Sequence, residues 1–255
     1  GYLTKTIKQN IFLMKITTHI FENAELSARA IASLIQEKAI AKKQQSQYFN
    51  IAVSGGSTPK FLFSLLAEED YRIQIPWETI RFFWVDERCV EPTHPESNFG
   101  MTYDALLQYA FVPAENIFRM KGEDIPENEA ERYKNLLWSK LPVKNGFPVF
   151  DLVLLGLGDD GHTASIFPDN LTLLETDKPV DVATHPLSGQ KRITLTGKTI
   201  NNAEEVVFLI NGKNKAKVVS NIINQQPVAK NYPANYVHNI AGQCSFFLDK
   251  EAVSF

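Results

Sequence analysis

Short apolar runs alternate along the chain with segments whose apolar residues recur every three or four positions. Residues 152–155 (LVLL) contain no polar position, which is typical of a strand buried on both faces of a parallel sheet. The alternation of such runs with helical segments predicts an α/β fold with a parallel sheet. The other predicted strands lie within residues 50–53, 80–85, 113–120, 180–184, 192–196, 205–210 and 245–248.

The segments between the apolar runs carry helix signals. Asn23 is placed to cap a helix that extends to about residue 41, Ser97 is placed to cap another, and residues 127–141 predict a third. Two more helices follow the turns after residues 53 and 210, the first with Thr58 as N-cap and Pro59 as its first helical residue.

We therefore predict a single Rossmann-like doubly wound domain over residues 15–255, with a mainly parallel sheet flanked by helices. Residues 1–14 are expected to be an N-terminal extension or an added segment, because the chain starts with Gly1 instead of a methionine.

Polar residues follow the run at 152–155. In open α/β sheets, ligands bind beyond the carboxyl ends of the strands, which is where Asp159, Asp160 and His162 are expected. Gly161 allows the sharp turn between them. His162 can exchange a proton near neutral pH and Asp160 is placed to orient it, so the motif predicts an acid–base site. The alternative is a strand-to-helix turn with a capping aspartate and a solvated histidine.

Two glycine turns follow predicted strands and precede predicted helices. At residues 54–59 (SGGSTP), free backbone N–H groups and the helix dipole would point at one spot, which predicts an anion site. This sequence is neither a Walker loop nor G-x-G-x-x-G, so it specifies no nucleotide, and a plain tight turn stays open. At residues 211–215 (NGKNK), Lys213 and Lys215 oppose the helix dipole unless an anion compensates their charge.

Charged residues also flank two other strands. Asp86, Glu87 and Arg88 follow the run at 80–85, where they form either part of a ligand site or a solvated turn with a local ion pair. Arg192 begins another strand and is either a surface residue or a ligand.

Composition narrows the class of protein. The chain has 255 residues, 44% of them hydrophobic and 22% charged, and a net charge of −3, so it has no general attraction to nucleic acid or anionic membranes. Cys89 and Cys244 lack metal-ligand spacing, and we expect neither a disulfide nor a structural zinc. Cys89 is either redox-sensitive or simply buried. No run approaches the roughly 18 apolar residues of a membrane span, and we expect a cytoplasmic protein.

Seven motifs are distributed along the chain from about residue 20 to the end. They are VSGGSTP (53–59), WVDERCV (84–90), SNFGM (97–101), GLGDDGHTASIFP (156–168), RITLT (192–196), NGKNKA (211–216) and FFLDKEA (246–252). Together they resemble the 6-phosphogluconolactonase family, within the wider superfamily that includes glucosamine-6-phosphate deaminase. The resemblance implies hydrolysis of 6-phospho-D-glucono-1,5-lactone to 6-phosphogluconate in the oxidative pentose phosphate pathway, with no metal or organic cofactor. It leaves a monomer or a small homo-oligomer open.

The resemblance also assigns residues. His162 matches the family's catalytic histidine, proposed to activate water, and Asp160 lies in the same motif. Arg88 matches the active-site arginine of the D-E-R motif, with Asp86 as a further active-site residue. Lys213 is an alternative to Lys215 as a phosphate ligand. The residues assigned to the substrate phosphate are Gly55, Gly56, Ser57, Thr58, Arg192 and Lys215.

The expected reaction is attack of water on the lactone carbonyl, with neutral His162 as base and Arg88 as either oxyanion stabiliser or substrate clamp. A serine acyl-enzyme is less favoured because the chain has no G-x-S-x-G elbow. The deaminases carry a glutamate where this chain has Phe167, which argues against ammonia release. A non-catalytic sugar-phosphate sensor is a third possibility, although the chain shows no helix-turn-helix segment or basic arm.

Overall fold

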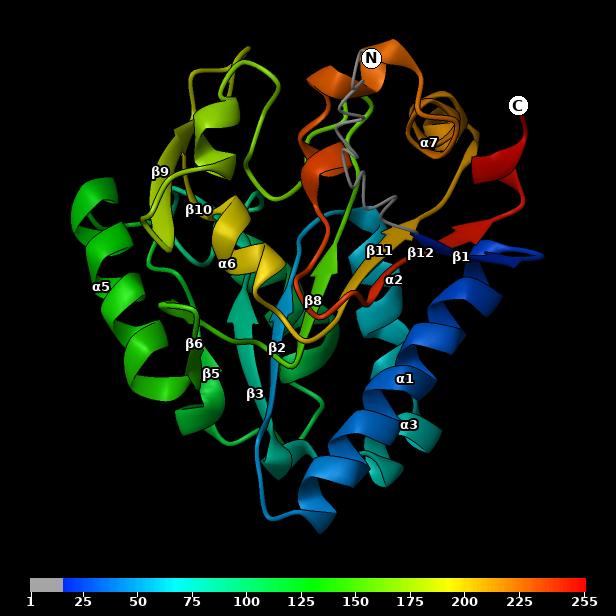
Figure 1. Ribbon diagram of the computed structural model, residues 1–255. Coiled ribbons are helices and arrows are strands. Elements are labelled where there is room, and N and C mark those ends of the chain that lie inside the picture. Colours follow the sequence, from blue (N-terminus) through cyan, green and yellow to red (C-terminus); the bar gives the residue numbers. More distant parts are fainter. Residues whose placement is uncertain (1–15) are drawn as a thin grey trace, which may run out of the picture.

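Parallel strands form the central sheet of the computed structural model, which describes residues 16–255 (Figure 1). The sheet has seven strands in the order β1-β12-β11-β8-β2-β3-β5, and every neighbouring pair is parallel. The predicted doubly wound fold is confirmed. The expected extension over residues 1–14 lies outside the described residues. The strands are β1 (Thr17–Phe21), β2 (Phe49–Val53), β3 (Ile80–Trp84), β5 (Ile117–Phe118), β8 (Leu152–Leu155), β11 (Val206–Ile210) and β12 (Cys244–Asp249).

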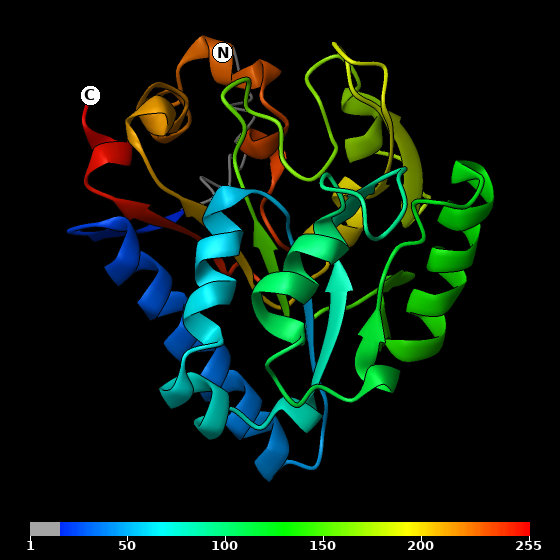
Figure 2. The same cartoon turned by 180° about the vertical axis from the view of Figure 1, so that it is seen from behind.

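Helices cover both faces of this sheet. In Figures 1 and 2, α1 and α2 lie along one side of the molecule and α5 along the other. Asn23 caps α1 by accepting the Leu26 N–H at 2.9 Å, and the Ser97 hydroxyl caps α4 by accepting the Gly100 N–H at 3.0 Å, as predicted. The helices are α1 (Ala24–Gln44), α2 (Ser57–Leu66), α3 (Glu69–Gln74), α4 (Asn98–Thr102), α5 (Pro126–Lys140), α6 (Gly197–Asn201) and α7 (Ala216–Ile223).

Two apolar cores explain why the central strands are mainly apolar. Ile51 and Val53 of β2 face the core that α1 and α2 share, whereas Ala52 between them faces the core that contains α5, α6 and α7. Successive side chains of a strand point to opposite faces, so a strand covered on both sides carries apolar residues toward both faces. By contrast, β1 lies at the sheet edge with its first four residues exposed, and it therefore carries no apolar run that would have predicted it.

The start of α2 differs from the prediction. The helix begins at Ser57 with Gly56 as its N-cap, so Thr58 is not the cap and Pro59 is not the first helical residue. Gly56 has φ +105°, a conformation that favours glycine and lets the chain turn into the helix earlier than the Thr-Pro signal suggests.

A second sheet lies beyond the carboxyl end of β3. It is antiparallel, in the order β4-β10-β9, with β4 at Asp86–Arg88, β9 at Val180–Thr184 and β10 at Lys191–Leu195. The sequence predicted β9 and β10 but treated the charged tripeptide at β4 as a site or a turn. A short hairpin, β6 (Val143–Lys144) and β7 (Phe147–Pro148), completes the strands described.

The chain order places a crevice at the middle of the central sheet. From β2 the chain continues to β3 on one side, whereas from β8 it continues to β11 on the other. The loops after β2 and β8 therefore separate above adjacent strands, which is where doubly wound proteins bind their ligands. Among the helices of residues 16–255, none is long and apolar enough to cross a membrane.

Candidate active site

The loops that follow β2, β3, β8 and β11 enclose a cavity of about 350 Å³. These four strands are neighbours in the sheet, so their carboxyl ends bring together segments that are far apart in sequence. Of the residues assigned to the site by the resemblance, all line this cavity except Asp160, which contacts His162, and the alternative Lys213.

The pair of His162 and Asp160 is held in the turn after β8. His162 Nδ1 lies 2.6 Å from Asp160 Oδ1, and the same oxygen accepts the His162 backbone N–H at 3.0 Å. Burial alone raises the pKa of Asp160, but the hydrogen bonds from His162 outweigh burial and lower that pKa to about 2. Asp160 is therefore ionised at neutral pH and stabilises the tautomer of His162 with its proton on Nδ1.

Glycine is required in this turn because the chain passes close to the histidine ring. A Cβ at Gly158 would lie 2.0 Å from His162 Nδ1. Gly161 has φ +83°, and a Cβ there would also collide with the Tyr232 ring. No helix follows β8 directly, so the strand-to-helix alternative is wrong.

Phe167 supports the other side of the histidine ring. Its ring centroid lies 4.8 Å from that of His162 and 5.0 Å from that of His185, and its side chain is buried. Burial, followed by the positive charge of Arg192, lowers the pKa of His185. The position where the deaminases carry glutamate is therefore filled here by an apolar ring.

Arg88 and Arg192 lie directly opposite each other on β4 and β10. Arg88 Nη1 donates to the Glu96 carbonyl at 2.7 Å, and Arg192 Nε donates to Gln190 Oε1 at 2.9 Å. Arg88 Nε is buried and has no hydrogen-bond partner within residues 16–255. Burial, followed by the charge of Arg88, lowers the pKa of Arg192. Like charges on opposite strands repel, so this pair favours a bound anion.

The glycine turn after β2 brings backbone N–H groups to the cavity. A Cβ at Gly55 would lie 1.8 Å from Asn98 Oδ1, so the close approach of this turn to α4 requires glycine. No side chain caps α2, and Ser57 and Thr58 line the cavity at its first turn. Uncapped N–H groups at a helix start bind anions readily.

The turn after β11 supplies one lysine to the cavity. Lys215 lines it, whereas Lys213 does not. Lys215 Nζ lies 2.7 Å from Asp159 Oδ1, which also accepts a 3.4 Å hydrogen bond from Asn214 Nδ2. The geometry therefore favours Lys215 over Lys213 as the ligand of the substrate phosphate.

The acidic residues of the D-E-R motif are buried and hold the loops in place. Asp86 Oδ2 accepts from the Ser165 hydroxyl at 2.7 Å, and the Asp86 carbonyl accepts from Asn98 Nδ2 at 3.0 Å. The Glu87 carboxylate accepts backbone N–H groups at the start of α4, and burial raises its pKa. Sequence reasoning named Glu87 only as part of a charged tripeptide and missed Asn98, although both stand in motifs that carried the resemblance.

Cys89 follows this motif and is half-buried. Burial raises the pKa of its thiol to about 11, so the thiol stays protonated at neutral pH. Because the thiolate is the reactive form, this favours a simply buried cysteine over a redox-sensitive one. Within residues 16–255, no group of three or more His, Cys, Asp or Glu side chains is arranged to hold a metal ion.

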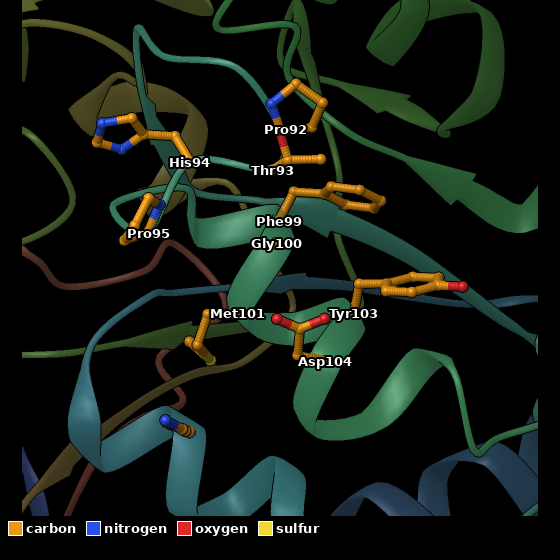
Figure 3. A pocket seen from close by; sticks show the side chains of 10 residues that line it. Pro92, Thr93, His94, Pro95, Phe99, Gly100, Met101, Tyr103 and Asp104 are labelled. Atoms are coloured by element: carbon orange, nitrogen blue, oxygen red, sulfur yellow. The ribbon is translucent and has the colours of Figure 1, made fainter.

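A larger cavity of about 640 Å³ lies on the other side of the loop at residues 92–95 and of α4 (Figure 3). None of the residues predicted for the site lines it. In Figure 3, His94, Phe99 and Met101 point to different sides of the loop and helix. The His94 ring accepts the Glu96 N–H at 3.0 Å, as suits a loop histidine. The smaller cavity is therefore the candidate active site.

Fold and site together define a class: a doubly wound α/β protein whose carboxyl-edge site combines a histidine–aspartate pair with groups that favour an anion. Comparison with known sequences narrows this class. The signature of the family described as glucosamine-6-phosphate isomerases/6-phosphogluconolactonase matches residues 22–246, and the chain belongs to this family.

Individual relatives agree with this assignment. The chain is 42% identical over 204 residues to a 6-phosphogluconolactonase of Treponema pallidum, covering 80% of this chain and 83% of the relative. It is 39% identical over 229 residues to that of Haemophilus influenzae, covering 89% and 96%. The structure of 6-phosphogluconolactonase from Trypanosoma cruzi superimposes with a TM-score of 0.83 at 32% identity, covering 94% of this chain and 96% of the other.

Proposed function

We propose that this chain is a 6-phosphogluconolactonase, a lactone hydrolase of the pentose phosphate pathway, in which His162 activates the attacking water. The substrate is 6-phospho-D-glucono-1,5-lactone and the product is 6-phosphogluconate. The family and the names of the relatives support the activity. The observation that carries the mechanism is the 2.6 Å contact between His162 Nδ1 and Asp160.

This contact leaves Nε2 of His162 as the basic nitrogen. Nε2 has no hydrogen-bond partner within residues 16–255, and the ring lines the cavity. In the proposed reaction, Nε2 takes a proton from water as the water oxygen attacks C1 of the lactone. Asp160 accepts the Nδ1–H and stabilises the imidazolium that forms.

Collapse of the tetrahedral intermediate completes the reaction. The bond between C1 and the ring oxygen breaks, and the imidazolium returns its proton to that oxygen, which becomes a hydroxyl. The carbonyl oxygen carries negative charge until this step, and in this proposal the Arg88 guanidinium, which lines the same cavity as His162, stabilises it. Water and lactone are consumed in equal amounts, and no cofactor enters the step.

The phosphate binds in the same cavity in this proposal. The N–H groups of the turn after β2, together with Arg192 and Lys215, provide donors and positive charge there. Binding energy from the phosphate orients the distant carbonyl toward His162.

The hydrogen bonds of the serines argue against a mechanism with a serine acyl-enzyme. Ser165 is fully buried and donates to Asp86, and the Ser54 hydroxyl donates to the Leu154 carbonyl at 2.7 Å. Within the described part of the chain, no serine hydroxyl is hydrogen-bonded to His162. A nucleophilic serine needs such a base.

The activity test follows proton release from freshly generated 6-phosphogluconolactone, with the spontaneous rate subtracted. Glucono-1,5-lactone, which lacks the phosphate, is the matched substrate control. We expect rapid turnover of the phosphorylated lactone and a much lower kcat/KM for the control, because the control loses the phosphate contacts. Hydrolysis no faster than the spontaneous rate, or release of ammonia from glucosamine 6-phosphate, would contradict the proposal.

A further inference from the structure

Two adjacent aspartates extend from the same turn and contact different functional side chains. Asp160 contacts His162 Nδ1 at 2.6 Å, whereas Asp159 contacts Lys215 Nζ at 2.7 Å. Asp159 therefore joins the turn after β8 to the turn after β11. Its carboxylate oxygen Oδ1 also accepts from Asn214 Nδ2, so it contacts two consecutive residues of that second turn.

We infer that Asp159 is a positioning residue that holds the Lys215 ammonium at the wall of the cavity, where it meets the substrate phosphate. The inference rests on the proposed function, because it takes Lys215 as a phosphate ligand. Asp159 does not itself line the cavity, so it acts through the lysine and not through the substrate.

The need for positioning comes from the chemistry of lysine. Its ammonium is a point charge on a flexible four-carbon stem, and it does not have the fixed fork of arginine. Ordering such a side chain costs conformational entropy on binding unless a contact restricts it beforehand. The Lys215 side chain is 22% exposed and that of Asp159 is 67% exposed, so the tether lies at the cavity rim and solvent can reach its carboxylate.

In this inference, an acceptor oxygen beside Lys215 Nζ is sufficient to hold the ammonium, although the carboxylate charge strengthens the contact. A full carboxylate charge beside Lys215 also repels an incoming phosphate, which an amide would not do. Asparagine at position 159 retains an acceptor oxygen in the same place and lacks the charge. The two substitutions Asp159→Ala and Asp159→Asn therefore separate positioning from electrostatics.

The two adjacent aspartates of this turn therefore have different roles. Asp160 fixes the base and Asp159 fixes a phosphate ligand, and the backbone between them fixes the spacing of the two. Substrate orientation and proton transfer are in this way set by one short turn.

The experiment measures kcat and KM for 6-phosphogluconolactone in single and double variants. The matched control is Asp177→Ala, since Asp177 is also an exposed aspartate paired with a lysine, Lys198, at 2.6 Å but lies away from the cavity. Asp159→Ala is expected to raise KM about threefold to fivefold with kcat little changed, because exposed ion pairs couple weakly. Asp159→Asn should stay within about twofold of the wild-type KM, and Asp177→Ala should match the wild type.

A double variant tests whether Asp159 acts through Lys215. Lys215→Ala should raise KM more than Asp159→Ala does, and adding Asp159→Ala to Lys215→Ala should cause no further increase. Calorimetric titration with 6-phosphogluconate repeats the comparison without turnover. We expect weaker binding in Asp159→Ala and recovery in Asp159→Asn.

The outcomes separate this inference from the proposed function. If Lys215→Ala raises KM while Asp159→Ala leaves both KM and product affinity unchanged, the positioning role is wrong and the proposed function stands. Additive effects of the two substitutions, or equal losses in Asp159→Ala and Asp159→Asn, would also overturn it. If Lys215→Ala leaves KM and product affinity unchanged, the phosphate assignment fails and the inference fails with it.

Discussion

His162 and Asp160 act as one unit at the scale of single residues. The histidine can serve as a base only if Nε2 is unprotonated, and the 2.6 Å contact at Nδ1 determines which nitrogen carries the proton. Phe167 restricts the ring from the other side, at a centroid distance of 4.8 Å. The orientation of the base therefore depends on one carboxylate and one aromatic ring.

Asp160→Asn tests this dependence. The amide can donate to Nδ1 instead of accepting from it, which favours the wrong tautomer, and kcat should fall by about 10²-fold or more. Because the pKa of Asp160 is lowered to about 2, its carboxyl is ionised throughout the range from about pH 5 to 8, and the deficit should be present across that range. Kinetics of wild type and variant across that range provide the measurement.

Asp177→Asn is the control for this substitution, since the exposed Asp177 pairs with Lys198 and neither residue lines the cavity. A deficit in Asp160→Asn that disappears as the pH rises, or a wild-type kcat throughout, would contradict the tautomer argument. The low pKa of Asp160 also contributes stability that is present above the unfolded pKa near 4 and is lost as pH falls toward 2. This contribution is small because the carboxylate is half exposed.

At the scale of secondary-structure elements, Tyr133 connects a helix to two strands. It is buried in α5, and its hydroxyl donates to the Phe118 carbonyl of β5 at 2.7 Å and accepts the Trp84 N–H of β3 at 3.2 Å. Burial raises the pKa of this hydroxyl far above its usual value. The hydroxyl is therefore neutral and acts only as a hydrogen-bonding bridge.

Tyr133→Phe should lower the free energy of unfolding by about 1–3 kcal/mol, because a buried N–H and a buried carbonyl lose their shared partner. Denaturant unfolding measures this loss, and kcat should stay near the wild-type value. Tyr48→Phe is the matched control, since Tyr48 is an exposed tyrosine. Equal stability of Tyr133→Phe and wild type would show that the bridge contributes nothing.

The elements also show how far the sequence could predict the fold. β2, β3, β8 and β11 were predicted because helices cover both of their faces, which favours long apolar runs. β1 and β4 were not predicted as strands, because one lies at an edge with exposed residues and the other consists of Asp-Glu-Arg. Their pairing depends on partners distant in sequence, namely β12 and β10.

At the scale of the whole molecule, the site is a consequence of strand order. The sequence supplied the polar residues of each turn and their likeness to a family, but it could not show that the four turns lie over adjacent strands. Nor could it show that Arg88 faces Arg192, or that Asp159 contacts Lys215. These contacts join residues separated by dozens of positions, and no local pattern encodes them.

The central claim is that His162 is the base, and stopped-flow hydrolysis of 6-phosphogluconolactone tests it most directly. Wild type and His162→Ala are compared side by side, with His19→Ala as control because His19 lies on β1 at the edge of the sheet. We predict that His162→Ala lowers kcat by about 10²–10⁴-fold with little change in KM, while His19→Ala retains wild-type kinetics. A wild-type kcat in His162→Ala would contradict the account.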